Sequence, residues 1–185
     1  MAESAARLVM DARRVDTTIK RIAHQIAEGA PEIDDLVLVS VGQSGLPLAR
    51  RLDLALRGIV DREVPLGVLD ITLYRDDLTI NSQPPIGETR LEFGIEKKAV
   101  ILVDKVIFTG RTIRAALDAL MEYGRPDLVR AAVLVDRGHR ELPIRADFVG
   151  LWLDTVHDDA VRVTLDPMPS TNDRIEVIPG WARGQ

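Results

Sequence analysis

The chain contains 185 residues, of which 24 are Lys or Arg and 29 are Asp or Glu, giving a net charge of −5. This length predicts one domain that can fold without disulfides, and the lack of cysteine excludes thiol nucleophiles and cysteine-ligated metal sites. The three histidines lack the spacing of a metal site, and the acidic balance restricts any nucleic-acid contact to a local basic patch.

Apolar residues occur in short periodic runs, none of which approaches the 18 residues of a membrane span, so we expect a cytoplasmic protein without a membrane partner. Helical spacing from Val15 to Ile26 predicts a helix, and the continuous apolar run 36–41 predicts a buried strand. The same patterns predict helices over 47–57 and 113–123 and strands over 64–74, 99–103 and 129–135. This alternation indicates an α/β fold with a mainly parallel sheet flanked by helices.

Two stretches depart from this alternation. Residues 75–94 form a long polar segment rich in turn residues, and a loop of that length is often functional. Beyond Gly150, the short alternating segments 161–165 and 174–178 predict antiparallel edge strands.

The strand at 99–103 runs into Asp104, and a helix follows near Thr112. Ligands of open parallel sheets bind at the carboxyl ends of strands, where this loop lies. The hydroxyls of Thr109 and Thr112, the turn at Gly110 and the free N–H groups of the helix suit a phosphate monoester. The alternative is a plain strand–turn–helix with Thr112 as the N-cap, but the apolar strand and Asp104 favour the phosphate site.

Three segments resemble known families. Residues 103–112 resemble the type I phosphoribosyltransferase signature, which has a strand, two acids, an apolar pair and Thr-Gly-x-Thr. Segments 69–77 and 134–148 resemble the PyrR family, whose members attenuate pyrimidine operons by binding mRNA and often act as uracil phosphoribosyltransferases. The resemblance implies the type I phosphoribosyltransferase fold in a single domain 1–185, with a core at about 14–150 and a hood of edge strands at 151–180.

The resemblance also implies roles for individual residues. Asp104 is the catalytic acid, the phosphate lies on Thr109, Gly110, Arg111 and Thr112, and the base packs on Phe148 and Val149. A flexible loop includes Arg75, Asp76 and Asp77, and RNA contacts fall on Arg21, His24, His139, Arg140 and Arg145. By composition alone, a solvated helix face explains the basic residues of the first helix better than RNA does.

Two departures from the family pattern affect the binding of phosphoribosyl pyrophosphate (PRPP). Lys105 occupies the position of the second acid, which reverses a charge interaction of roughly 4 kcal/mol for a pair 4 Å apart at an effective dielectric constant of about 20. The pyrophosphate loop, usually Thr-Arg-Gly, reads Gln43, Ser44, Gly45, so the guanidinium that would hold pyrophosphate is missing.

These departures lead us to expect a PyrR-like regulator that binds a pyrimidine nucleotide (UMP or UTP) or PRPP and an mRNA leader, with uracil phosphoribosyltransferase activity weakened or lost. We expect no permanently bound cofactor and no metal held by protein ligands alone. Mg²⁺ would accompany PRPP only in an active enzyme, and Lys105 could stand in its place. The resemblance further implies a homodimer or homotetramer.

Two alternatives stay open. The first is an active enzyme that converts uracil and PRPP to UMP and pyrophosphate. The second, weaker alternative is a scaffold or a purine-nucleotide binder, because residues 151–155 resemble a purine phosphoribosyltransferase hood about as closely as the PyrR one. Within that stretch, we expect Trp152 to fill core space.

Overall fold

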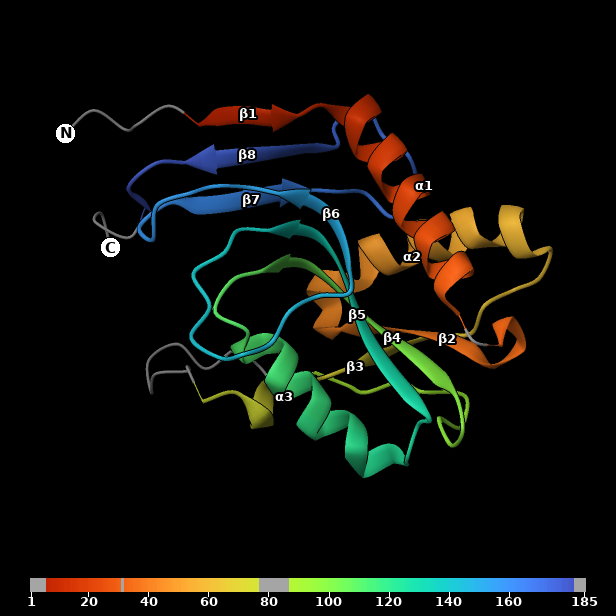
Figure 1. Cartoon of the computed structure of the whole chain (residues 1–185). Helices are drawn as coiled ribbons and strands as arrows, with labels where there is room; N and C mark the ends of the chain where they lie inside the picture. The colour runs from red at the N-terminus through yellow and green to blue at the C-terminus, as the bar shows by residue number, and fades with distance from the viewer. Residues whose placement is uncertain (1–5, 31, 77–86, 182–185) are drawn as a thin grey trace.

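The computed structural model describes residues 6–30, 32–76 and 87–181. Its centre is a five-stranded sheet in which every neighbouring pair of strands is parallel. The strand order is β3 (Leu66–Leu69), β2 (Leu36–Val41), β4 (Ala99–Ile107), β5 (Leu128–Asp136) and β6 (Phe148–Trp152). The predicted α/β class with a mainly parallel sheet is therefore confirmed (Figure 1).

Helices cover both faces of this sheet (Figure 1). The helices α1 (Ala12–Gly29) and α2 (Gly42–Val60) pack on one face, and α3 (Arg111–Leu120) packs on the other. Alternate residues of β2 divide between the faces, with Leu36 and Leu38 toward α1 and α2 and Val37 and Val39 toward α3. This burial on both faces explains why the strand reads as a continuous apolar run. None of the helices within the described ranges is long and apolar enough to cross a membrane.

Several predicted boundaries were wrong. The strand expected at 99–103 continues to Ile107, because Asp104 pairs with Val133 and Ile107 pairs with Asp136 of β5. The strand expected at 64–74 ends at Leu69, and a 3₁₀ turn, η2 (Thr72–Tyr74), follows it. The α2 helix begins at Gly42 instead of 47, and α3 ends at Leu120, where another 3₁₀ turn, η3 (Met121–Tyr123), follows.

A second sheet contains three antiparallel strands in the order β1 (Arg7–Met10), β8 (Arg174–Ile178) and β7 (Ala160–Thr164). The two antiparallel strands predicted at 161–165 and 174–178 are present as β7 and β8, but they pair with each other in this second sheet and do not lie at the edge of the central sheet. No sequence pattern predicted β1, which lies beside β8 in Figure 1. The hood-like sheet thus joins residues from both ends of the chain.

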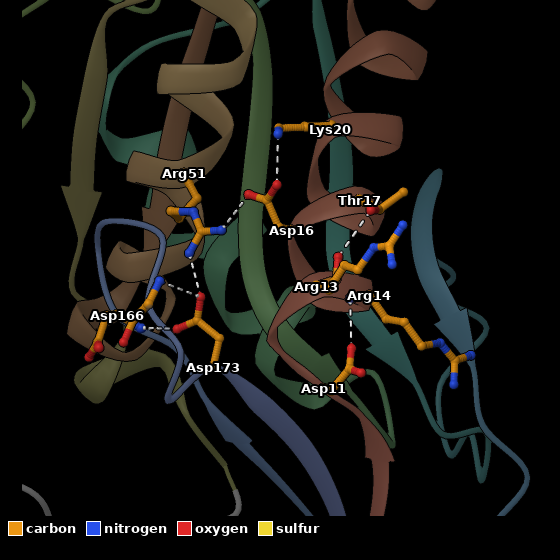
Figure 2. A network of polar contacts seen from close by, with 10 residues as sticks. Asp11, Arg13, Arg14, Asp16, Thr17, Lys20, Arg51, Asp166 and Asp173 are labelled. Atoms are coloured by element: carbon orange, nitrogen blue, oxygen red, sulfur yellow. Dashed lines mark hydrogen bonds and ion pairs between the residues drawn. The ribbon is translucent and has the colours of Figure 1, made fainter.

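A buried ionic network connects the two sheets through the helices (Figure 2). Arg51 of α2 donates from Nη1 to Asp173 in the β7–β8 turn at 2.7 Å and from Nη2 to Asp16 of α1 at 2.8 Å. The side chains of Arg51 and Asp173 are 2% and 1% exposed. Asp16 also binds the ammonium of Lys20 at 2.7 Å. Hydrogen bonds from Lys20 and Arg51 lower the pKa of Asp16, although burial opposes them.

Candidate functional site

The segment after β4 forms a tight loop at the carboxyl edge of the central sheet. Gly110 has φ +95° and is the N-cap of α3, so the helix begins at Arg111 and Thr112 is not the N-cap. A Cβ at Gly110 would lie 3.4 Å from the Cβ of Ile144, and its backbone conformation favours glycine. The N-cap residue Gly110 has no side chain to cap the helix, and the hydroxyl of Thr109 accepts the backbone N–H of Arg111 in a long hydrogen bond of 3.4 Å. The N–H groups of this first turn therefore suit an anion, as predicted for the loop 109–112.

The loop after β5 packs against this segment. The backbone N–H groups of Glu141 and Leu142 donate to the carbonyl of Thr109 at 3.0 and 3.1 Å. Arg140 donates to the carbonyl of Phe108 at 2.6 Å and to the carboxylate of Asp136 at the end of β5. The guanidinium of Arg140 is thus used to join two loops, although we predicted that it contacts RNA.

The side chain of Arg111 lies between two carboxylates. Its Nε is 2.7 Å from Glu141, and its Nη1 is 3.0 Å from Asp76 in the segment after β3. Both carboxylates raise the pKa of Arg111, and the hydrogen bond to Glu141 is the largest cause. In this arrangement the side chain of Arg111 connects two loops, and its backbone N–H donates to the Thr109 hydroxyl at 3.4 Å. Asp77 lies outside the described residues.

Asp104 is a buried carboxyl near the end of β4, 8% exposed. Its Oδ1 accepts the backbone N–H of Lys105 at 2.7 Å. Burial raises the pKa of Asp104 to about 6, while that hydrogen bond and the charges of Lys105 and Arg75 act in the opposite direction. A carboxyl with two neighbouring cations does not fit Mg²⁺ on protein ligands, and the described residues contain no cluster of three potential metal ligands.

The raised pKa of Asp104 makes stability depend on pH. A carboxyl whose pKa rises from 3.8 to about 6 on folding adds stability below pH 3.8, and this contribution is lost as the pH rises through 6. We expect Asp104→Asn, which keeps the acceptor for Lys105 N–H, to raise the free energy of unfolding by about 3 kcal/mol at pH 8. At pH 4 it should change little. Urea unfolding of both proteins at pH 8 and pH 4 measures the change in the free energy of unfolding. An equal change at the two pH values would contradict the prediction.

The three pyrophosphate-loop positions lie in the first turn of α2. Gln43 and Ser44 are exposed, and Gly45 is buried. A Cβ at Gly45 would lie only 2.5 Å from the carbonyl oxygen of Val103, so the helix touches the backbone of β4 just before Asp104. Because β2 and β4 are adjacent parallel strands, the first turns of α2 and α3 follow strands that end at the same edge of the sheet.

The two predicted base-pocket residues lie on opposite faces of β6, and Val149 is in register with Asp104 through Val133 of β5. Phe148 begins β6, is 8% exposed and packs in the core beside α1, with the guanidinium of Arg130 at 5.9 Å from its ring centroid. Val149 packs on the α3 side of the sheet. Trp152 at the end of β6 is 66% exposed, so the expectation that it fills core space was wrong.

Some of the predicted RNA-binding side chains form hydrogen bonds within the protein, and others are exposed. Arg21 on α1 donates to the carbonyls of Val149 and Gly150 and so fastens α1 to the edge strand β6. His24 and Arg145 are exposed. His139 is also exposed, and its Nε2 lies 2.7 Å from the carbonyl of Thr155.

Sequence reasoning missed two residues that the structure brings to the same edge, Phe108 and His157, and it grouped Arg137 only with the basic residues considered for RNA. The ring of Phe108 contacts His157 and His139, and the guanidinium of Arg137 lies over it. Phe108 could have been found from its position next to Thr109. His157 carried no signal, because it lies beyond Gly150, where the resemblance fades.

Comparisons with known proteins agree with this geometry. The family model described as "Phosphoribosyl transferase domain" matches residues 9–165. The chain is 48% identical over 176 residues to "Bifunctional protein PyrR" of Thermus thermophilus, covering 95% of each chain. It is 51% identical over 158 residues to the protein of the same name from Pelotomaculum thermopropionicum, covering 85% of this chain and 87% of that one.

Solved structures give the same fold. Hypoxanthine phosphoribosyltransferase of Trypanosoma cruzi, in complex with the product IMP, superimposes with a TM-score of 0.63 at 22% identity, over 83% of this chain and 79% of that one. At this identity the likeness concerns the fold alone, and it confirms the predicted type I phosphoribosyltransferase architecture.

Proposed function

Since this chain belongs to the PyrR family of phosphoribosyl transferase domain proteins, we propose that it is a regulator that binds a pyrimidine nucleotide and an mRNA leader. Its uracil phosphoribosyltransferase activity, by this proposal, is weakened or lost. The relatives are named bifunctional, and the difference proposed here concerns residues of this chain. The cytoplasmic location and the homodimer or homotetramer stay predictions.

The observation that carries this proposal is a phosphate loop with glycine at the N-cap of α3, beside a single carboxyl with cationic neighbours. Thr109, Gly110 and the first turn of α3 keep the features that suit a 5′-phosphate. Asp104 is followed by Lys105 and is also near the charge of Arg75. Such a site favours a monophosphate over a donor with a metal-bound diphosphate, because the group that would help to balance Mg²⁺ has the opposite charge.

A Mg²⁺ ion bound with PRPP would supply positive charge to the leaving diphosphate, and this chain lacks the second acid and the arginine that would help to hold the two. Ser44 replaces the guanidinium at the first turn of α2. Because stabilisation of the leaving group is the main catalytic resource in this chemistry, both replacements lower turnover more than they lower nucleotide binding. The ammonium of Lys105 can supply part of the positive charge that a metal would bring.

Calorimetry with UMP and with PRPP, each in Mg²⁺ and in EDTA, tests the nucleotide part of this proposal. We expect UMP to bind with the same affinity in both buffers, because the phosphate contacts come from the backbone and hydroxyls of residues 109–112. PRPP should bind more weakly than UMP. Tight binding of PRPP that depends on Mg²⁺ would contradict the proposal and favour the active enzyme.

The RNA part of the proposal predicts strong salt dependence. The exposed side chains of His24 and Arg145 are available for phosphates and bases, whereas Arg21 and Arg140 bind backbone carbonyls. Affinity for the leader transcript should fall steeply with salt, and Arg145→Ala should reduce the slope of log K against log salt by about 0.7–0.9. Filter binding over a salt series measures this.

The matched control is Arg125→Ala. Arg125 is also an exposed arginine, but it lies in the connection between α3 and β5, at the opposite edge of the sheet. Its replacement should leave the slope unchanged. A flat salt response of the unmodified protein would count against RNA binding.

A further inference from the structure

Three consecutive carbonyl groups, from the end of β4 into the phosphate loop, face the loop that follows β5. The carbonyl of Ile107 accepts a backbone N–H at 3.2 Å, and the carbonyl of Phe108 accepts a guanidinium N–H at 2.6 Å. The carbonyl of Thr109 accepts two backbone N–H groups at 3.0 and 3.1 Å. The donors all lie in residues 137–142, here named the bracing loop, and are Arg137, Arg140, Glu141 and Leu142.

The direction of these carbonyls fixes the direction of the N–H groups that follow them. A trans peptide is planar, and its C=O and N–H groups point in opposite directions. The peptide that carries the carbonyl of Phe108 also carries the N–H of Thr109, and the next peptide carries the N–H of Gly110. Both N–H groups therefore point away from the bracing loop, and no acceptor among the described residues receives them. Free N–H groups at a strand-to-helix turn are the donors of the proposed phosphate site.

Arg140 supplies the side-chain donor of this set, and its guanidinium is held on several sides. Its Nε donates to the carbonyl of Ile144 at 2.8 Å, and its Nη1 also donates to the carbonyl of Gly138 at 3.1 Å. Its Nη2 donates to the carboxylate of Asp136, whose other oxygen accepts the N–H of Gly138 at 2.9 Å. The side chains of Arg140 and Asp136 are 19% and 0% exposed. A planar guanidinium with these partners has one defined position.

We propose that Arg140 is a positioning residue of the phosphate site, which orients the N–H of Thr109 through the carbonyl of Phe108. The inference rests on the proposed nucleotide site, and it assigns to Arg140 a role in nucleotide binding that needs no RNA. A phosphate at the N–H and a guanidinium at the carbonyl polarise the same peptide in the same direction, so each hydrogen bond strengthens the other. Arg140 thus contributes to phosphate affinity through the geometry of its hydrogen bonds as well as through its charge.

The test compares Arg140→Lys with the unmodified protein by calorimetry with UMP, ribose 5-phosphate and uridine, in the absence of RNA. Lysine keeps the positive charge but lacks the planar fork that joins the carboxylate of Asp136 to the carbonyls. Loss of a group that orients direct ligands costs about 10–100-fold in affinity at metal sites. We therefore expect UMP and ribose 5-phosphate to bind the variant about 10-fold more weakly, both by the same factor. Uridine has no phosphate, and its affinity should not change.

Asp136→Asn tests the same role without altering Arg140, and it decides the matter if Arg140→Lys does not fold. Asparagine has one acceptor oxygen in place of two, so it cannot serve both the guanidinium and the N–H of Gly138. It should weaken both phosphate ligands and leave uridine unchanged. The double variant should bind UMP no more weakly than Arg140→Lys alone, because both changes act through one guanidinium. Independent structural losses would add instead.

Arg62→Lys is the matched control, because Arg62 also binds a carboxylate and a carbonyl, both of Asp34, at the opposite edge of the sheet. It should bind all three ligands as the unmodified protein does. If Arg140→Lys keeps its affinity for UMP, or loses affinity for UMP but not for ribose 5-phosphate, the positioning role is wrong and the proposed function stands. If neither UMP nor ribose 5-phosphate binds the unmodified protein, the proposed nucleotide site fails, and the positioning role fails with it.

Discussion

The double variant with Lys105→Asp and Ser44→Arg is expected to form UMP from uracil and PRPP at least about 10²-fold faster than the unmodified chain. Lys105→Asp places a second carboxylate beside Asp104 and removes a cation that repels Mg²⁺. Ser44→Arg places a guanidinium in the exposed first turn of α2, beside the end of β4. Each change restores charge where the leaving diphosphate develops it, and a single such group typically contributes 10²–10³ in rate.

Lys97→Asp provides the matched control for this experiment. Lys97 is an exposed lysine with φ +58°, a conformation that aspartate tolerates, and it precedes β4 at the opposite end of the strand. The same change of charge there should not affect UMP formation. Rapid UMP formation by the unmodified chain would show that the transferase tolerates Lys105 and Ser44. A double variant that binds PRPP tightly and still forms no UMP would show that other residues limit the reaction.

Local patterns predicted the strands whose own residues form a continuous or an alternating apolar run. The apolar run 36–41 coincides with β2, and the alternation over 174–178 coincides with β8. The end of β4 could not be read in this way, because the polar pair Asp104 and Lys105 suggests a loop. Pairing with β5, in which Val106 lies opposite Val135, keeps these residues in the strand. Tertiary pairing thus overrides local polarity.

The strand β1 was missed for a related reason. It has four residues, and its partner β8 lies at the other end of the chain, so no local pattern indicates it. The 3₁₀ turn after β3 was missed because Asp70 accepts a hydrogen bond from the hydroxyl of Thr72 at 2.8 Å. Such a side-chain bond competes with continued strand pairing, and the apolar pattern does not contain it.

The sequence located the candidate site better than it assigned the side chains around it. The phosphate loop was found because its residue types and its place after a strand are both local features. The roles of Phe148 and Arg140 depend on which way a side chain points. A one-residue change of register would move Phe148 to the other face of the sheet, and the sequence alone does not fix that register. Arginine suits both RNA phosphate and backbone carbonyls, so Arg140 gave no sign that it joins two loops.

Arg51→Ala is expected to lower the free energy of unfolding by about 3–5 kcal/mol, because it removes one partner from a buried ion pair. The side chain of Asp173 is 1% exposed and would keep only the backbone N–H groups of Asp166 and Ser170 as donors. Asp16 would keep its contact with Lys20. Urea unfolding monitored by circular dichroism measures the loss.

Arg57→Ala on the same helix is the matched control, since Arg57 also pairs with two carboxylates, Asp53 and Glu63, but its side chain is 44% exposed. Ion pairs in contact with water contribute little, so the loss for this variant should be much smaller.

Combining Arg51→Ala with Asp173→Asn should restore part of the stability, because the uncompensated buried charge is then gone. Equal losses for Arg51→Ala and Arg57→Ala would show that the network adds no more than a surface pair. The attachment of the β7–β8 turn to α1 and α2 would then have to come from apolar contacts alone.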